Sequence, residues 1–192
     1  MPQRYIDTTL FDLFKVGPGP SSSHTIGPMK AGHHFAETCA ALPRDLLVRA
    51  VRFRVRLYGS LSATGTGHGT DAAVVAGLLG TAPESCPAGL LQELMDDPHT
   101  RRKRSLGDGQ VSVCVDDVSH DAIIHDFPYS NTLVADLLDA EDNVLHSQEY
   151  YSVGGGFIQW KGWEPPLLGE PVHRYSNMTE LRSIVKEKGL NI

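Results

Sequence analysis

Residues 51–57, Val51-Arg52-Phe53-Arg54-Val55-Arg56-Leu57, carry the strongest strand signal in the chain. Apolar side chains alternate with arginines, which is the period of a β-strand with one buried and one solvated face. Residues 59–69, which include four glycines and several serines and threonines, follow this segment and predict a loop. The apolar run 71–79 then predicts a buried helix that ends at Gly80.

Further strands are expected beyond this helix. Short segments rich in β-branched and aromatic residues predict them at residues 111–115, 122–125, 132–138 and 144–152. Residues 139–143 form a turn between the last two, and so short a connection joins antiparallel neighbours. The glycines at 154–156 interrupt the last strand before residues 157–160.

The N-terminal side adds helices to this sheet. Thr9 is placed to cap a short helical turn, and the Gly-Pro-Gly-Pro run at 17–20 forces an irregular loop. A longer helix opens at Pro28 and stops before Pro43. The sequence therefore predicts an α/β (α+β) fold with a mixed, largely antiparallel sheet and flanking helices.

The prolines and glycine that follow residue 163 mark a boundary, so one domain is expected over residues 1–163. Residues 164–192 are predicted to form a linker and an amphipathic helix at 178–188. This helix is too small to bury its apolar face, made of Leu181, Ile184 and Val185, and it is expected to lead to a missing or separate domain.

Composition excludes several classes of function. A net charge of −6 gives no footprint for nucleic acid, and the one basic run, 101–104, is interpreted as a solvated loop. No apolar run approaches the ~18 residues of a membrane span. The first residues lack the charged-then-apolar pattern of a signal peptide, so a cytoplasmic location is expected.

The three cysteines predict no metal site in this chain. Cys39, Cys86 and Cys114 are odd in number and widely spaced, which argues against a disulfide framework and against a self-contained zinc or cluster site. All three are interpreted as buried structural thiols.

A polar motif at residues 21–25 precedes the helix that opens at Pro28. It places the hydroxyls of Ser21, Ser22, Ser23 and Thr25 and the His24 imidazole beside a helix N-terminus. Unpaired N–H groups and the helix dipole favour a carboxylate or phosphate there. A helix that is merely capped by Ser23 or Thr25 is the alternative, and the residues alone do not separate the two.

A second glycine-rich motif at residues 64–71 repeats the design. His68 and Thr70 stand before another helix, and an imidazole suits a general base because it titrates near neutral pH. The motif lacks the endings of the phosphate-binding and dinucleotide-binding loops. A locally hydrogen-bonded histidine remains the alternative for His68, and a turn-forming role the alternative for Asn131, which precedes a predicted strand.

Three landmarks resemble the bacterial iron–sulfur L-serine dehydratases, in the same order along the chain. They are Phe11-Asp12-Leu13-Phe14 with Gly17-Pro18-Gly19-Pro20-Ser21-Ser22-Ser23-His24-Thr25 and Gly27-Pro28-Met29, then Gly67-His68-Gly69-Thr70-Asp71, then Tyr150-Tyr151-Ser152-Val153-Gly154-Gly155-Gly156-Phe157. Residues 128–132 depart from the pattern, because many members carry a His-Pro-Asn or similar triplet there. The resemblance covers nearly the whole chain.

The resemblance implies that this chain is the β portion of such an enzyme. It implies a fold similar to the allosteric substrate-binding domain of phosphoglycerate dehydrogenase, L-serine as substrate, and a [4Fe–4S] cluster ligated outside this segment by an α domain or chain. A homo-oligomer is also expected. In the family, an open iron site activates the substrate hydroxyl as a leaving group.

The resulting hypothesis assigns roles to the two motifs. Ser21, Ser22, Ser23 and Thr25, helped by Thr70 and Asn131, bind the substrate, while His24 and His68 act as base and charge partner. Which histidine is the base stays open. Two other functions also stay open: a small-carboxylate-binding regulatory module without catalysis, and a dehydratase acting on a related hydroxy or amino substrate.

Overall fold

The computed structural model describes residues 14–164 and 173–190. The chain divides into two compact units, one formed by Lys15–Trp163 and the other by Met1–Phe14 with Glu164–Ile192. The first unit holds the sheet and almost all helices, while the described part of the second holds the helix α7 (Met178–Lys188). The expected turn after Thr9 and the proline-rich boundary at 165–171 lie outside the described residues.

The sheet has seven strands, and the fold class predicted from the sequence is confirmed. Six strands follow the order β2-β3-β1-β5-β6-β7, and β4 pairs with β1 as well. Their bounds are β1 (Arg52–Gly59), β2 (Arg102–Leu106), β3 (Gly109–Val113), β4 (Val118–His120), β5 (Asn131–Leu138), β6 (Val144–Ser152) and β7 (Ile158–Trp160). Only the pairings of β1 with β3 and with β4 are parallel, so the sheet is mixed and largely antiparallel.

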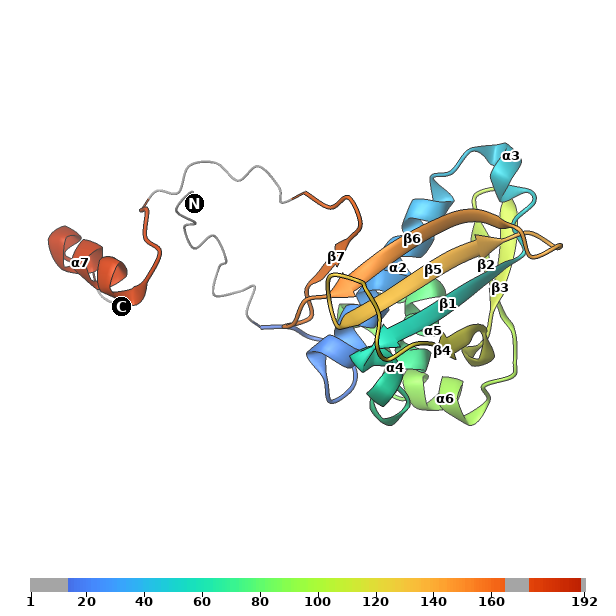
Figure 1. Ribbon diagram of the computed structural model, residues 1–192, viewed down its shortest axis with the longest axis horizontal. Helices are drawn as coiled ribbons and strands as arrows, with labels where there is room; N and C mark the ends of the chain where they lie inside the picture. Colours follow the sequence, from blue (N-terminus) through green and yellow to red (C-terminus); the bar gives the residue numbers. More distant parts are fainter. Residues whose placement is uncertain (1–13, 165–172, 191–192) are drawn as a thin grey trace. The chain divides into compact units, whose positions relative to one another are not determined.

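One face of this sheet is covered by the helices α2 (Gly27–Ala40) and α5 (Thr70–Leu78), which lie behind the strands in Figure 1. The alternation predicted for β1 is confirmed, because Phe53, Val55 and Leu57 are buried and the arginines between them are only partly buried. Helix α5 is buried almost throughout, as its apolar sequence predicts.

The other face of the sheet carries a cluster of charged and polar side chains. Asp136 of β5 is 1% exposed and lies between Arg54 and Arg56, with N–O distances of 2.7 and 3.1 Å. Ser147 donates a further hydrogen bond of 2.7 Å to the same carboxylate. The side chains of Arg54 and Arg56 are 34% and 35% exposed, so the ion pairs with the buried carboxylate lie at the surface of this face.

Short helices connect these elements: α3 (Arg44–Leu47), α4 (Ser60–Thr64) and α6 (Leu90–Asp96). Single turns add η1 (Ser22–Ile26), η2 (Thr66–His68), η3 (Pro83–Ser85) and η4 (Val115–Asp117). No helix in the described part of the chain is long and apolar enough to cross a membrane.

Several local predictions are wrong. The basic run 101–104 is not a loop, because strand β2 begins at Arg102, which is bonded to Glu93. Arg101, just before the strand, is bonded to Asp117. Residues 59–69 contain the helix α4 and the turn η2 rather than an uninterrupted loop. Residues 122–125 form no strand, and the short β4 precedes them.

The cysteines are all free thiols. Cys39 and Cys114 are buried as expected, and burial raises the pKa of the Cys39 thiol to about 12. Cys86 is only partly buried, so the expectation of a buried thiol is wrong for this residue.

Candidate active site

The two polar motifs, far apart in sequence, meet in the structure. Residues 22–26 form the turn η1, which Ser21 caps and which runs directly into α2, and residues 64–70 lead through η2 into α5. The ring centroids of His24 and His68 lie 5.1 Å apart, with the rings tilted by 37°. The structure therefore pairs the two histidines that the sequence singles out.

Close packing of α2 against α5 brings the two helix starts together. A Cβ atom at Gly77 of α5 would lie 2.1 Å from the Met29 carbonyl oxygen, and one at Gly32 of α2 would lie 2.5 Å from the Val74 carbonyl oxygen. Because neither distance leaves room for a side chain, glycine at both positions lets the helix backbones touch.

The turn η1 has the wide π-helical form, a form that is frequent at functional sites. Ser21 caps it, since its hydroxyl accepts a hydrogen bond of 3.2 Å from the His24 backbone N–H. The cap is thus Ser21 rather than Ser23 or Thr25. Ser22 and Ser23 open the helical run, where backbone N–H groups have no partner within the helix.

Both nitrogens of the His24 ring contact hydroxyl groups. Nδ1 lies 2.9 Å from the Ser23 hydroxyl, and Nε2 lies 3.0 Å from the hydroxyl of Ser60, the first residue of α4. A hydroxyl both donates and accepts, so either tautomer of a neutral His24 fits this arrangement.

His68 has a different arrangement. Its Nδ1 lies 2.9 Å from the Thr64 carbonyl oxygen. Because a carbonyl only accepts, Nδ1 carries the proton, and in the neutral ring Nε2 keeps its lone pair. His68 also lines an open pocket of about 670 Å³ together with residues 16–20 and part of residues 83–95. The geometry thus leaves one imidazole nitrogen of His68 available to a ligand.

The surroundings of His24 favour its neutral ring. Partial burial, followed by the nearby His68, lowers the pKa of His24, and the hydrogen bond at Ser60 opposes this only in part. A lowered pKa keeps the His24 ring uncharged at neutral pH.

We expect the His24 ring to titrate below 6.5, the ordinary value for histidine, in NMR spectra of the ring C–H groups recorded across pH. His68→Asn removes the one neighbouring charge that lowers the pKa of His24 but leaves the larger effect of burial, so this pKa should rise part of the way toward 6.5. A wild-type pKa of His24 at or above 6.5 contradicts this description of the pair.

Asn131 and Ser152 join the site at the strand ends. Asn131 begins β5, and its side-chain amide donates to the Ser152 carbonyl oxygen over 3.4 Å. The Ser152 hydroxyl, at the end of β6, donates to the Ser23 carbonyl oxygen over 2.8 Å. Asn131 therefore contacts the polar motif through Ser152, and not through a hydrogen bond of its own among the described residues.

Comparison with known proteins identifies the family of this chain. The profile described as "Serine dehydratase beta chain" matches residues 9–163. The chain belongs to this family. It is 37% identical over 193 residues to L-serine dehydratase 2 of Escherichia coli (strain K12), covering 96% of this chain and 41% of that protein.

Other relatives in the serine dehydratase family give the same picture. The chain is 38% identical over 194 residues to L-serine dehydratase of Streptomyces coelicolor, with 96% of this chain and 42% of that protein covered. It is 39% identical over 200 residues to L-serine dehydratase 1 of Escherichia coli (strain K12), with 96% and 41% covered. The chain thus spans about two fifths of the length of these relatives.

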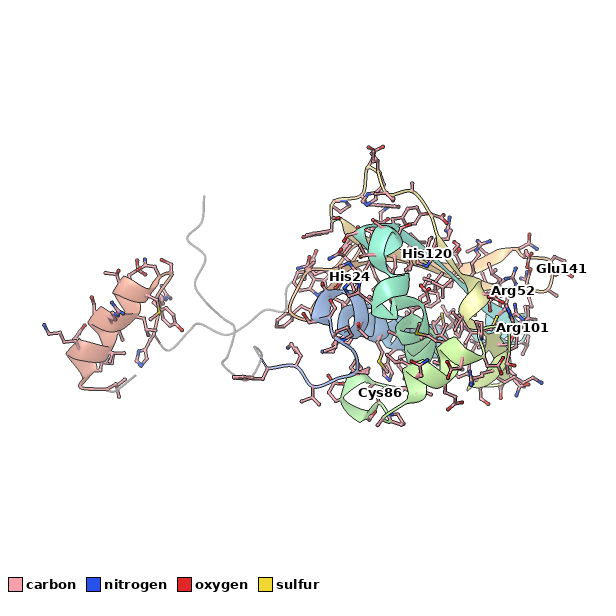
Figure 2. All side chains as sticks on the ribbon, turned by 90° about the horizontal axis from the view of Figure 1, so that it is seen from below. His24, Arg52, Cys86, Arg101, His120 and Glu141 are labelled. Atoms are coloured by element: carbon pink, nitrogen blue, oxygen red, sulfur yellow. The ribbon has the colours of Figure 1, made fainter. Side chains whose placement is uncertain are left out.

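We also searched the described residues for side chains that could hold a metal ion. Among residues 14–164 and 173–190, no group of three or more His, Cys, Asp or Glu side chains is placed to hold a metal ion. Cys39 is fully buried with a raised thiol pKa, and Cys86 lines the same pocket as His68 without completing a group of three metal ligands. Figure 2 shows Cys86 well apart from His24.

Sequence reasoning missed several residues that shape this site. Ser60 directly follows the predicted strand and Ser152 lies within the third landmark, yet neither had been assigned a role. His120 gave no signal at all. Its Nδ1 lies 3.0 Å from the Ser62 carbonyl oxygen and its Nε2 3.2 Å from a carboxylate oxygen of Asp71.

The pKa of His120 is raised, whereas the pKa of His24 is lowered. Partial burial alone would lower the pKa of His120, but the contacts with Ser62 and Asp71 outweigh this effect and raise it. Since Ser62 belongs to α4 and Asp71 to α5, a protonated His120 ties together the two ends of the segment that carries His68.

A second charged cluster lies elsewhere. Asp117 is held by Arg101 over 2.8 Å and by Arg52 over 3.6 Å. Figure 2 shows Arg52 and Arg101 together on the side of the sheet domain away from His24. We infer that this cluster stabilises the sheet and takes no part in the candidate active site.

Proposed function

We propose that this chain provides the substrate-binding and proton-transfer half of an L-serine dehydratase active site, in which L-serine is converted to pyruvate and ammonia. One observation carries the proposal: His24 and His68 form a close pair, and His68 lines an open pocket while its Nδ1 is bonded to the Thr64 carbonyl, which leaves a lone pair on Nε2 of the neutral ring. The family membership and the names of the relatives support serine as the substrate.

His68 is the general base in this proposal. The α-proton of serine is weakly acidic, so its removal needs a base that is neutral at working pH and held within reach of the carbon. The Thr64 carbonyl fixes the tautomer of His68, so that Nε2 of the neutral ring carries the lone pair. Loss of the α-proton and of the β-hydroxyl as water gives an aminoacrylate, which hydrolyses to pyruvate and ammonia.

His24 serves as the partner of His68. Its neutral ring lies 5.1 Å away and adds no charge that would oppose protonation of His68 during the reaction. Through Ser60 and Ser23 it also fixes the position of the residues that bind the carboxylate.

The start of η1 is the proposed carboxylate anchor. Ser22 and Ser23 contribute first-turn N–H groups, and a helix N-terminus attracts negative charge. No hydrogen bond within the described residues occupies the Ser22 hydroxyl, whereas the hydroxyls of Ser21 and Ser23 already contact His24. Ser22 is therefore the hydroxyl best placed to bind substrate directly.

The other half of the site is proposed to come from protein outside this chain, including the ligands of the [4Fe–4S] cluster that the family resemblance implies. The loops at the histidine end of the sheet support this, because they expose large apolar side chains: Val16, Ile123, Ile124, Tyr129, Val153 and Phe157. Exposed apolar patches mark contact surfaces. The relatives also carry more than half of their length beyond the matched region.

Ile124→Asp is expected to weaken binding of this chain to the separately produced remainder of a relative by at least ~10-fold, because a charge would be buried in the contact. Ile124 is 93% exposed, so the fold of the free chain should not change. Val144→Asp, at the opposite end of the sheet and 49% exposed, is the control. Equal affinities for both variants in a titration would place the contact elsewhere.

Calorimetry with L-serine separates the proposal from a regulatory module. A half-site lacks much of the contact that orders its ligand, so the chain alone should bind serine weakly, with a Kd above ~1 mM. Micromolar binding by the isolated chain would instead support a small-carboxylate sensor without catalysis of its own.

A further inference from the structure

Two fully buried threonines link the histidine motifs in a reciprocal way. The Thr25 hydroxyl donates to the His68 carbonyl oxygen over 3.0 Å, and the Thr70 hydroxyl donates to the His24 carbonyl oxygen over 2.6 Å. Both threonines are 0% exposed. Thr25 directly follows His24, and Thr70 lies two residues after His68. Each threonine is hydrogen-bonded to the backbone carbonyl of the histidine in the other motif.

This arrangement bears on how the hydroxyls can act. A threonine hydroxyl has one proton to donate, and in both residues it is directed to a backbone carbonyl. Both side chains are 0% exposed, so neither offers surface to a ligand, unlike the partly buried Ser22. A direct role in binding the substrate carboxylate, expected from the sequence, therefore has no support in this geometry.

The remaining links between the two motifs are few. The helices touch at Gly32 and Gly77, beyond the first turns, and the His24 ring contacts Ser60 over 3.0 Å. Neither contact fixes the backbone of both histidines. The two threonine bonds do so, because each ends on a histidine carbonyl and begins on the neighbouring element.

We propose that Thr25 and Thr70 are a pair of positioning residues that fix the separation and orientation of His24 and His68, rather than ligands of the substrate. This role rests on the proposed function where turnover is concerned, but the positioning itself is a property of the chain alone. Reactions that need a base near a carbon lose about 100-fold when a group is misplaced by about 1 Å.

Paired substitutions test the proposal. Thr25→Val and Thr70→Val keep the shape and remove the hydroxyl, while Thr25→Ser and Thr70→Ser keep the hydroxyl. In the enzyme completed with the remainder of a relative, each valine variant should lower kcat by about 10- to 100-fold with KM changed less than about 3-fold. Each serine variant should keep kcat within about 3-fold. A raised KM with an unchanged kcat in the valine variants would show substrate binding and overturn the proposal.

NMR of the chain alone tests positioning without turnover. In Thr70→Val, the pKa of His24 should rise toward 6.5, because its ring is no longer held beside His68, and Thr70→Ser should keep the wild-type value. Unchanged titration of His24 in the valine variant of a folded chain would refute the positioning role. If the completed wild-type enzyme shows no turnover, the proposed function fails, yet this measurement still decides the role of the threonines.

A folding control accompanies both measurements. Circular dichroism and urea unfolding identify a valine variant that does not fold, and Thr25→Ala or Thr70→Ala then takes its place. Since one hydrogen bond begins in each motif, substitutions of Thr25 and of Thr70 should both change kcat and the pKa of His24 in the same direction. A change seen with Thr25 substitutions but absent with folded Thr70 substitutions would overturn it.

Discussion

His68→Asn is expected to lower turnover of L-serine by at least ~100-fold in the completed enzyme, with little change in the stability of the chain. Asparagine retains a donor for the Thr64 carbonyl, so the local backbone contact survives while the basic Nε2 is lost. Steady-state kinetics of pyruvate formation measures the effect. His99→Asn is the matched control, because His99 is highly exposed and pairs only with Asp116 among the described residues.

The open surroundings of His68 allow a second readout. His68→Ala leaves space next to a pocket of about 670 Å³, so added imidazole should restore part of the lost activity by acting as the base. Near-normal turnover of His68→Asn would reject His68 as the base. Such a result would assign proton removal to His24 or to the missing half of the site.

Gly77→Ala has the second large expected effect, and it acts on the fold that holds the site. The added methyl group would lie 2.1 Å from the Met29 carbonyl oxygen and 2.8 Å from the His33 backbone nitrogen, so α2 and α5 must move apart. Overpacking of this kind costs about 1–3 kcal/mol in the free energy of unfolding. Urea unfolding of the chain measures it.

Gly67→Ala is the matched control for this experiment. A Cβ atom at Gly67 would meet nothing within 4 Å, so the free energy of unfolding should change by less than about 0.5 kcal/mol. Because the helix starts carry His24 and His68, Gly77→Ala should also raise the pKa of His24 toward 6.5. Equal unfolding midpoints for the two variants would show that the helix contact is looser than described.

The elements predicted best from the sequence are those whose pattern is set locally. The alternation over residues 51–57 matches β1, and the amphipathic run 178–188 matches α7, which Asn177 caps. The helix 71–79 is shifted by one residue from α5. In each segment the side-chain period and the cap come from the segment's own residues.

The errors arise where distant partners decide the structure. Arg101 and Arg102 appear solvated in sequence, but Asp117 and Glu93 give them ion-pair partners beside strand β2. Ile123 and Ile124 have strand-forming side chains, yet both are exposed in the loop that precedes β5. Local propensity does not contain either of these long-range effects.

In the candidate site, too, the sequence predicts the local features but not the contacts between distant residues. The sequence singles out His24 and His68, but not their 5.1 Å separation, which depends on the glycine contacts between α2 and α5. The sequence predicts that Thr25 and Thr70 bind the substrate because their hydroxyls belong to the two polar motifs. Their full burial follows from packing between two helices and is not visible in either motif alone.

The most direct measurement of the central claim is anaerobic reconstitution of pyruvate formation from L-serine. The chain would be combined with the separately produced remainder of a relative, with iron and sulfide restored, and each part would also be assayed alone. A split active site predicts turnover only when both parts are present, and its loss with His68→Asn in this chain. No turnover in a demonstrably assembled complex, or full turnover without this chain, would contradict the account.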